Sequence, residues 1–175
     1  MAQPAPEAAA FSSFDGKSSP EGEGIERSAM DHSVTIHPML PDEAEAVSAL
    51  EITCFPDPWS VKSLTEMLAN PHAHYLAAKK DGKIIGYIGT LTVLDEGDIL
   101  RIAVDPAERK QGIGTALVKA LFRDTSDIKI WNLEVRESNT AAVMLYRKSG
   151  FALLTKRKAY YHHPTEDALL MQMKF

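Results

Sequence analysis

A glycine-containing segment in the middle of the chain has the composition of an anion-binding loop. Apolar residues 102–104 lead into Arg109-x-x-Gly112-x-Gly114, and a helical pattern follows. Glycines lack a Cβ atom, so backbone amides can approach a ligand closely, and the first turn of a helix offers unpaired N–H groups. Such a loop suits a pyrophosphate. Glycines that merely turn the chain into a helix would look the same, so the loop alone leaves both interpretations open.

Two other families of phosphate loop are excluded by spacing. The segment lacks the Gly-Lys-Ser/Thr sequence that ends a Walker loop, and it lacks Gly-x-Gly-x-x-Gly. The sequence therefore favours neither a P-loop nucleoside triphosphatase nor a dinucleotide-binding domain.

A second group with possible chemistry follows the loop. Glu134 stands between the apolar residues Leu133 and Val135, near the end of an expected strand. A carboxylate at the mouth of a cleft can accept a proton as a general base. An ion pair with Arg136 or another base is the structural alternative, which the residues alone favour.

Hydrophobic spacing indicates the elements that would position these residues. Asp81-Gly82 between two apolar runs is a strong hairpin signal, and Gly150 ends a helical pattern. Strands precede, interleave with and follow helices, which indicates one mixed sheet in an α/β protein. Strands are expected at 34–36, 74–80, 83–94, 99–105, 128–135, 151–160 and 167–174, with helices after Pro41, after the cap Ser60, around 116–121 and over 139–149.

Length, charge and cysteine content exclude several classes of protein. The chain has 175 residues, which suits one domain, and no apolar run approaches the roughly 18–20 residues of a membrane span. Its net charge of -5 argues against a nucleic-acid coat, because phosphate binding needs a basic surface. Cys54 is the only cysteine, which fits a reducing cytoplasm. The histidine pairs at 72/74 and 162/163 lack a third ligand, so no metal is expected.

The first 33 residues differ from the rest in composition. They carry six acidic and two basic residues, and 18 of them are Ala, Ser, Gly or Pro. Such a segment buries too little apolar surface to offset its ordering entropy. We expect a disordered acidic tail over 1–33 and a folded domain over 34–175.

The loop and four further motifs resemble a known family. Arg109-x-x-Gly112-x-Gly114 resembles the acetyl-coenzyme A loop of the GNAT acyltransferase superfamily. Over residues 34–175, the ordered motifs are similar to those of the RimI-type ribosomal-protein alanine N-acetyltransferases: CFPDPWS at 54–60, LEVRESN at 133–139, LYRKSGF at 145–151, and Tyr160-Tyr161 with Glu166-Asp167-Ala168. The resemblance implies the GNAT fold, a mixed and mostly antiparallel sheet with flanking helices, in which acetyl-CoA enters between two splayed parallel strands.

The resemblance also implies roles for individual residues. Glu134 falls on the general-base position, and Tyr146 on the position of the general acid that protonates the departing thiolate. Taken alone, Tyr146 is better explained as a core aromatic, and Asn139 as a helix cap. The implied acetyl-CoA contacts are Arg109, Lys110, Gln111, Gly112, Ile113, Gly114, Thr115 and Asn139, together with backbone N–H groups of Ile102, Ala103 and Val104 that would bind the thioester oxygen.

The acceptor side is implied by fewer residues. Trp59, Tyr160 and Tyr161 would line it, although large aromatics are equally suited to packing. Arg101 stands where relatives usually carry an uncharged polar residue, and we expect it to face the acceptor groove and favour acidic acceptors.

The resemblance implies transfer of acetyl from acetyl-CoA to the α-amine of an N-terminal alanine, with the eighteenth protein of the small ribosomal subunit as the substrate. A GNAT acting on other N-termini or on a small amine is the alternative, and a non-catalytic acetyl-CoA-binding module is the remote one. The ordered motif from Tyr160 to Ala168 argues against a small amine, and the presence of both Glu134 and Tyr146 argues against the module. The oligomeric state stays open.

Overall fold

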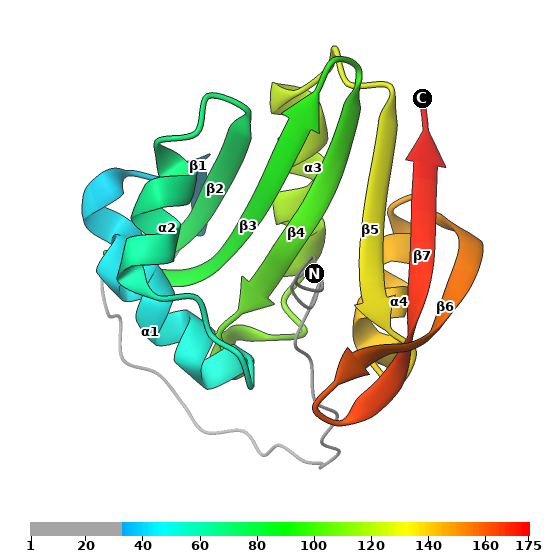
Figure 1. Ribbon diagram of the computed structural model, residues 1–175. Coiled ribbons are helices and arrows are strands. Elements are labelled where there is room, and N and C mark those ends of the chain that lie inside the picture. Colours follow the sequence, from blue (N-terminus) through cyan, green and yellow to red (C-terminus); the bar gives the residue numbers. More distant parts are fainter. Residues whose placement is uncertain (1–32) are drawn as a thin grey trace, which may run out of the picture.

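Seven strands form one mixed sheet in the order β1-β2-β3-β4-β5-β7-β6 (Figure 1). The computed structural model describes residues 33–175, so the expected acidic tail lies outside the described residues apart from Ser33. The strands are β1 (Thr35–Pro38), β2 (Ala73–Lys80), β3 (Lys83–Val93), β4 (Glu96–Val104), β5 (Ile130–Arg136), β6 (Ala152–His162) and β7 (Thr165–Lys174).

Helices connect the strands at the positions that the sequence predicts. The α-helices of the described residues are α1 (Ala44–Cys54), α2 (Val61–Leu68), α3 (Ile113–Asp124) and α4 (Thr140–Lys148), and 3-10 turns span Pro41–Glu43 and Pro106–Glu108. None of these described helices is long and apolar enough to cross a membrane.

Local signals explain several of these boundaries. The Ser60 side chain accepts a hydrogen bond from the Ser63 amide and so caps α2. Asp81 and Gly82 both have positive φ angles, as the tight turn between β2 and β3 requires. Gly150, with φ of 101°, follows the end of α4. The predicted hairpin and helix ends are confirmed.

The parallel strands β4 and β5 separate partway along their length. Their pairing runs from Glu96 opposite Ile130 to Ile99 opposite Leu133 and ends there, although β4 continues to Val104 and β5 to Arg136. The other neighbouring strands of the sheet pair antiparallel. The expected mixed, mostly antiparallel sheet with a splayed parallel pair is confirmed.

Two hydrophobic cores hold the helices against the sheet. On one face, Leu117 and Leu121 of α3 pack with Trp131 and other apolar residues of the strands. On the other face, Val47 of α1 and Leu64 of α2 pack with strand residues. Figure 1 shows α1 and α2 over the β2–β4 side of the sheet, whereas α3 and α4 lie behind it. No helix of residues 33–175 therefore covers the face of β5, β7 and β6 that is turned toward the viewer, and the splay opens at the border of that face.

Candidate active site

The glycine-containing loop opens onto a cleft between α3 and α4. Gly112 is the N-cap of α3 with φ of 79°, and a Cβ atom built on it would meet nothing within 4 Å. The backbone is thus open to a ligand at the point where α3 presents its first N–H groups. The cleft has a volume of about 300 Å³ and is lined by Val104, Glu108, Arg109, Lys110, Gly112, Ile113, Gly114, Thr115, Ala141, Met144, Leu145 and Lys148.

Most residues implied for acetyl-CoA binding line this cleft, but four do not. Gln111 donates through its side chain to Glu108 at 3.1 Å. Ile102 and Ala103 are buried in β4, where backbone rather than side-chain atoms would act. Asn139 accepts a hydrogen bond from the Ala142 amide at 3.2 Å and caps α4. The structural interpretation of Asn139 is therefore confirmed, and its contact with acetyl-CoA stays a prediction.

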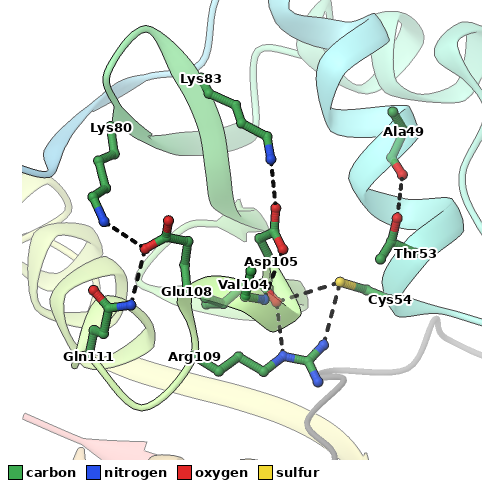
Figure 2. A network of polar contacts seen from close by, with 11 residues as sticks. Ala49, Thr53, Cys54, Lys80, Lys83, Val104, Asp105, Glu108, Arg109 and Gln111 are labelled. Carbon is green, nitrogen blue, oxygen red and sulfur yellow. Dashed lines mark hydrogen bonds and ion pairs between the residues drawn. The ribbon is translucent and has the colours of Figure 1, made fainter. Parts of the chain in front are cut away.

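The lysines at the ends of β2 and β3 hold the loop from one side (Figure 2). Lys80 Nζ lies 2.9 Å from Glu108 Oε2, and Lys83 Nζ lies 3.0 Å from Asp105 Oδ2. The Asp105 carboxylate also accepts from the Ala107 amide at 3.0 Å. This amide, together with Lys83, lowers the pKa of Asp105 below its usual value, although partial burial opposes the shift.

Arg109 holds the loop from the other side. Its Nε donates to the backbone oxygen of Val104 at 3.0 Å, and its Nη2 lies 3.7 Å from Cys54 Sγ (Figure 2). Cys54 Sγ in turn lies 3.6 Å from the same Val104 oxygen. Burial raises the pKa of the Cys54 thiol, and the Arg109 guanidinium opposes that shift. One side chain thus ties the loop to the end of β4 and to the end of α1.

Sequence reasoning missed the wall of the cleft that α4 provides. Ala141, Met144, Leu145 and Lys148 recur at the three- and four-residue spacing of one helical face. Met144 is 55% exposed although it is apolar, as expected for a side chain on an open cleft. The helical spacing, ending in a lysine near the implied pyrophosphate loop, is the signal that could have revealed this wall. With Arg109 and Lys110, Lys148 gives the cleft three cations suited to phosphate groups.

Glu134 is the first residue of β5 beyond the paired part of the parallel ladder. Its neighbours Leu133 and Val135 belong to the core with α3, so Glu134 points to the opposite face of the sheet. Its Oε1 accepts a hydrogen bond from Arg157 of β6, whereas Oε2 is buried without a hydrogen-bond partner among the described residues.

The ion pair considered as the alternative for Glu134 therefore exists, but with Arg157. Arg136 instead binds Glu166 at 3.3 Å. The pair engages one carboxylate oxygen and leaves the other available as an acceptor, so it is compatible with a general base. That role stays a prediction.

Tyr146 is buried in α4 and belongs to the core on the α3 side. Its ring packs edge-on against Phe151, with 5.6 Å between the ring centroids. Burial raises the pKa of Tyr146 well above its usual value, and nearby Tyr161 adds to the shift. An ordinary phenol, with a pKa of about 10, is already protonated at neutral pH, and the upward shift makes this phenol a weaker acid. Both the packing role and the acid role are consistent with this placement, and the second stays a prediction.

The aromatic residues expected at the acceptor side lie on two separate segments. Trp59 is half-buried in the loop between α1 and α2, where its ring lies 6.5 Å from that of Tyr75. Tyr160 and Tyr161 lie on β6, and Tyr161 is 5% exposed with Arg136 over its ring. Figure 1 shows the α1–α2 loop and the β6–β7 hairpin at the end of the sheet where β4 and β5 separate.

The expectation that the Arg101 side chain faces the acceptor groove is wrong. Its side chain is 1% exposed, and Nη1 lies 2.9 Å from Oε2 of the fully buried Glu51. Nη2 donates to the backbone oxygen of Asp57 at 3.0 Å. The reason is the opposite charge of Glu51 in α1, which holds the guanidinium inside the molecule.

The chain matches the Acetyltransferase (GNAT) family over residues 44–151, and it belongs to that family. Acetyl-CoA is therefore its acetyl donor, and the open backbone at Gly112 with the lysines of the cleft fits that molecule. Residues 33–175 contain no cluster of three or more side chains suited to a metal ion.

Several proteins similar to this chain are named as acetyltransferases that act on a protein N-terminus. The chain is 37% identical over 145 residues to a Bacillus subtilis protein provisionally named a ribosomal protein bS18-alanine N-acetyltransferase, covering 81% of this chain and 96% of that protein. It is 36% identical to the N-alpha-acetyltransferase RimI of Mycobacterium tuberculosis, covering 79% and 91%. The crystal structure of the ribosomal-protein-S18-alanine N-acetyltransferase from Escherichia coli superimposes with a TM-score of 0.76 at 32% identity, covering 81% of this chain and 94% of that one. The resemblance to RimI-type enzymes is confirmed.

Proposed function

We propose that this chain transfers the acetyl group of acetyl-CoA to the α-amine of an N-terminal alanine, with ribosomal protein bS18 as the substrate. The relatives named for that reaction support the acceptor. The observation that carries the proposal is the end of the β4–β5 ladder at Ile99 and Leu133. The splay between β4 and β5 has the cleft of α3 and α4 on one side and, on the other, Glu134 Oε2, which has no hydrogen-bond partner within residues 33–175.

Each residue has a defined chemical task in this reaction. Backbone N–H groups of residues 102–104, beyond the paired ladder, would donate to the thioester oxygen as the carbon becomes tetrahedral. Glu134 Oε2 would accept the proton that the α-amine loses as its nitrogen bonds to the acetyl carbon, directly or through a water. The Tyr146 hydroxyl would donate its proton to the sulfur as the carbon–sulfur bond breaks.

The intrinsic acidity of the acceptor favours an α-amine over a lysine side chain. An α-amine has a pKa of about 7.7–8.0, whereas that of lysine is about 10.4, so far more of the α-amine is neutral at pH 7. A site between the α1–α2 loop and the β6–β7 hairpin, which flank the splay in Figure 1, would accept an extended peptide end.

The test uses synthetic peptides that share an internal lysine and differ only at their first residue. We expect acetylation at the α-amine of the alanine peptide, read by tandem mass spectrometry. A peptide with a blocked α-amine is the matched control and should remain unmodified. Mainly ε-acetylated lysine, or a polyamine acetylated faster than every peptide, would overturn the N-terminal assignment.

A further inference from the structure

Two opposite charges are buried beneath the α1–α2 loop. Glu51 of α1 is 0% exposed and Arg101 of β4 is 1% exposed, and 2.9 Å separates Oε2 from Nη1. Tyr87 of β3 donates its hydroxyl proton to the other Glu51 oxygen. Burial raises the pKa of Glu51, while the Arg101 guanidinium and the Tyr87 hydroxyl oppose that shift.

Both charged groups also hold the loop itself, residues 55–60. Glu51 Oε2 accepts from the Trp59 amide at 2.8 Å, and Arg101 Nη2 donates to the Asp57 backbone oxygen at 3.0 Å. The rings of Phe55 and Trp59 lie 4.3 Å and 5.1 Å from the guanidinium carbon. The loop is thus tied to α1 at Trp59 and to β4 at Asp57, through the two members of one ion pair.

Stability alone is a weak explanation for this arrangement. Taking two ions out of water costs several kcal/mol each, and apolar side chains of similar volume often replace a buried pair without loss. Arg101 Nε and the Tyr75 hydroxyl are also buried without a hydrogen-bond partner among the described residues. Tyr75 and Arg101 flank Gly89 across the sheet, and the Tyr75 ring covers that glycine. Buried polar atoms without hydrogen-bond partners lower the stability of the fold. The benefit of this cluster is therefore the fixed geometry that it gives to the α1–α2 loop.

The charges of the cluster do not cancel at its surface. Arg101 is neutralised by Glu51, but Asp57, whose Oδ2 lies 3.4 Å from Arg101 Nη2, keeps 66% of its side chain exposed. The loop therefore presents a carboxylate to solvent at the end of the sheet where the splay opens (Figure 1). The exposed charge of the loop is thus negative, whereas the sequence, with Arg101 considered alone, predicted a positive charge facing the acceptor.

We propose that the Glu51–Arg101 pair is a positioning device that fixes the α1–α2 loop for acceptor binding, with the Asp57 carboxylate disfavouring acidic residues next to the acceptor α-amine. This inference rests on the proposed N-terminal acetylation. Arg101 acts through the loop and touches neither substrate.

Steady-state kinetics with alanine peptides that carry Lys, Gln or Glu in second position test the proposal. The wild-type enzyme should prefer Lys over Glu, increasingly so at low salt. In Arg101→Met, the KM for the acceptor should rise about ten- to a hundredfold, because the loop loses its hold on β4. The KM for acetyl-CoA should stay within about twofold, because the cofactor cleft has its own anchors. Arg123→Met, which removes an exposed ion pair with Asp124, is the matched control and should change neither constant.

A double variant separates positioning from folding. Glu51→Gln/Arg101→Met removes both charges of the pair, and the amide oxygen at position 51 can still accept from the Trp59 amide. We expect it to recover most of the stability lost in Arg101→Met, measured by urea unfolding, while the acceptor KM stays high because the Asp57 contact is absent. Recovery of both stability and acceptor KM would overturn the proposal, as would a wild-type preference for Glu over Lys.

Hydrogen exchange distinguishes failure of this proposal from failure of the proposed function. Arg101 holds the Asp57 backbone oxygen and packs against the rings of Phe55 and Trp59, so hydrogen exchange over residues 55–60 should accelerate in Arg101→Met and not in Arg123→Met. Unchanged exchange would overturn the positioning role even if alanine peptides are good substrates. Absence of peptide acetylation in the wild-type enzyme would instead overturn the proposed function.

Discussion

Two loops flank the splay of β4 and β5 and are held in place by different contacts: the Gly112 loop on the cofactor side, and the α1–α2 loop (residues 55–60) on the proposed acceptor side. The loop that carries Gly112 relies on an open backbone, on partly exposed ion pairs such as Lys83 with Asp105, and on the contact of Arg109 with Cys54. The α1–α2 loop, for which we propose acceptor binding, relies on the fully buried pair of Glu51 and Arg101. A change in the first should stay local to acetyl-CoA binding. A change in the second should alter both the loop and the stability of the fold.

The largest expected effect lies between the two sides, at the acid–base pair. Glu134→Gln and Tyr146→Phe are nearly isosteric, and each should bind acetyl-CoA normally while kcat falls by roughly a hundred- to ten-thousandfold. Isothermal titration with acetyl-CoA and single-turnover kinetics separate the two quantities.

The ion pair of Glu134 supplies the matched control for this prediction. Arg157→Met removes the hydrogen bond to Glu134 Oε1 but leaves the carboxylate in place. We expect a smaller loss of kcat than in Glu134→Gln. Losses below about threefold in both Glu134→Gln and Tyr146→Phe would indicate catalysis by positioning alone, without an acid or base.

The next effect in size isolates the cofactor side. Gly112 and Gly82 have φ angles of 79° and 78°, and a Cβ atom at either position meets nothing within 4 Å. Valine should therefore strain both positions alike, by about 1–2 kcal/mol. Only Gly112 lines the cleft, so only Gly112→Val should raise the KM for acetyl-CoA, by about tenfold, equivalent to one lost hydrogen bond to a charged group.

Paired thermal unfolding of these two variants checks that they are equally strained. An acetyl-CoA KM that rises as much in Gly82→Val as in Gly112→Val would mean that general destabilisation, and not access to the loop backbone, controls binding.

The contrast between the two sides also explains what the sequence could predict. Gly112, the Asp81-Gly82 turn and the Ser60 cap act on neighbouring backbone, so their residue types and spacing carry the information. The elements and the cofactor loop were accordingly predicted close to their observed positions. The splay of β4 and β5 was predicted only from the resemblance to the GNAT superfamily, because no single residue encodes it.

Long-range partners were beyond the reach of pattern and spacing. The burial of Arg101 depends on Glu51 in α1, and the partner of Glu134 is Arg157 in β6 rather than the nearby Arg136. The ion-pair partner of each residue is decided by which side chains the folded sheet brings together. Spacing cannot distinguish Arg136 from Arg157 as the partner of Glu134, because both carry the same charge. Lys148 was missed for a different reason, because its helical spacing was visible but was not connected to the cleft.

The smallest expected effect concerns the anchor of the cofactor loop and its dependence on pH. The Ala107 amide and Lys83 lower the pKa of Asp105, so the folded protein keeps this carboxyl ionised where the unfolded chain, with a pKa of about 3.9, already binds a proton. Its stabilising contribution is therefore complete above the unfolded value and is lost as the pH falls through the lower folded value. Because Lys83 is 73% exposed, that contribution is at most about 1 kcal/mol.

Urea unfolding of wild type and Asp105→Asn should show a difference in unfolding free energy that is constant above about pH 5 and shrinks toward zero in more acidic solution. Asp127→Asn, at an exposed position after α3, is the control for removal of a surface carboxylate. A difference between wild type and Asp105→Asn that grows as the pH falls would show that ionised Asp105 does not stabilise the loop.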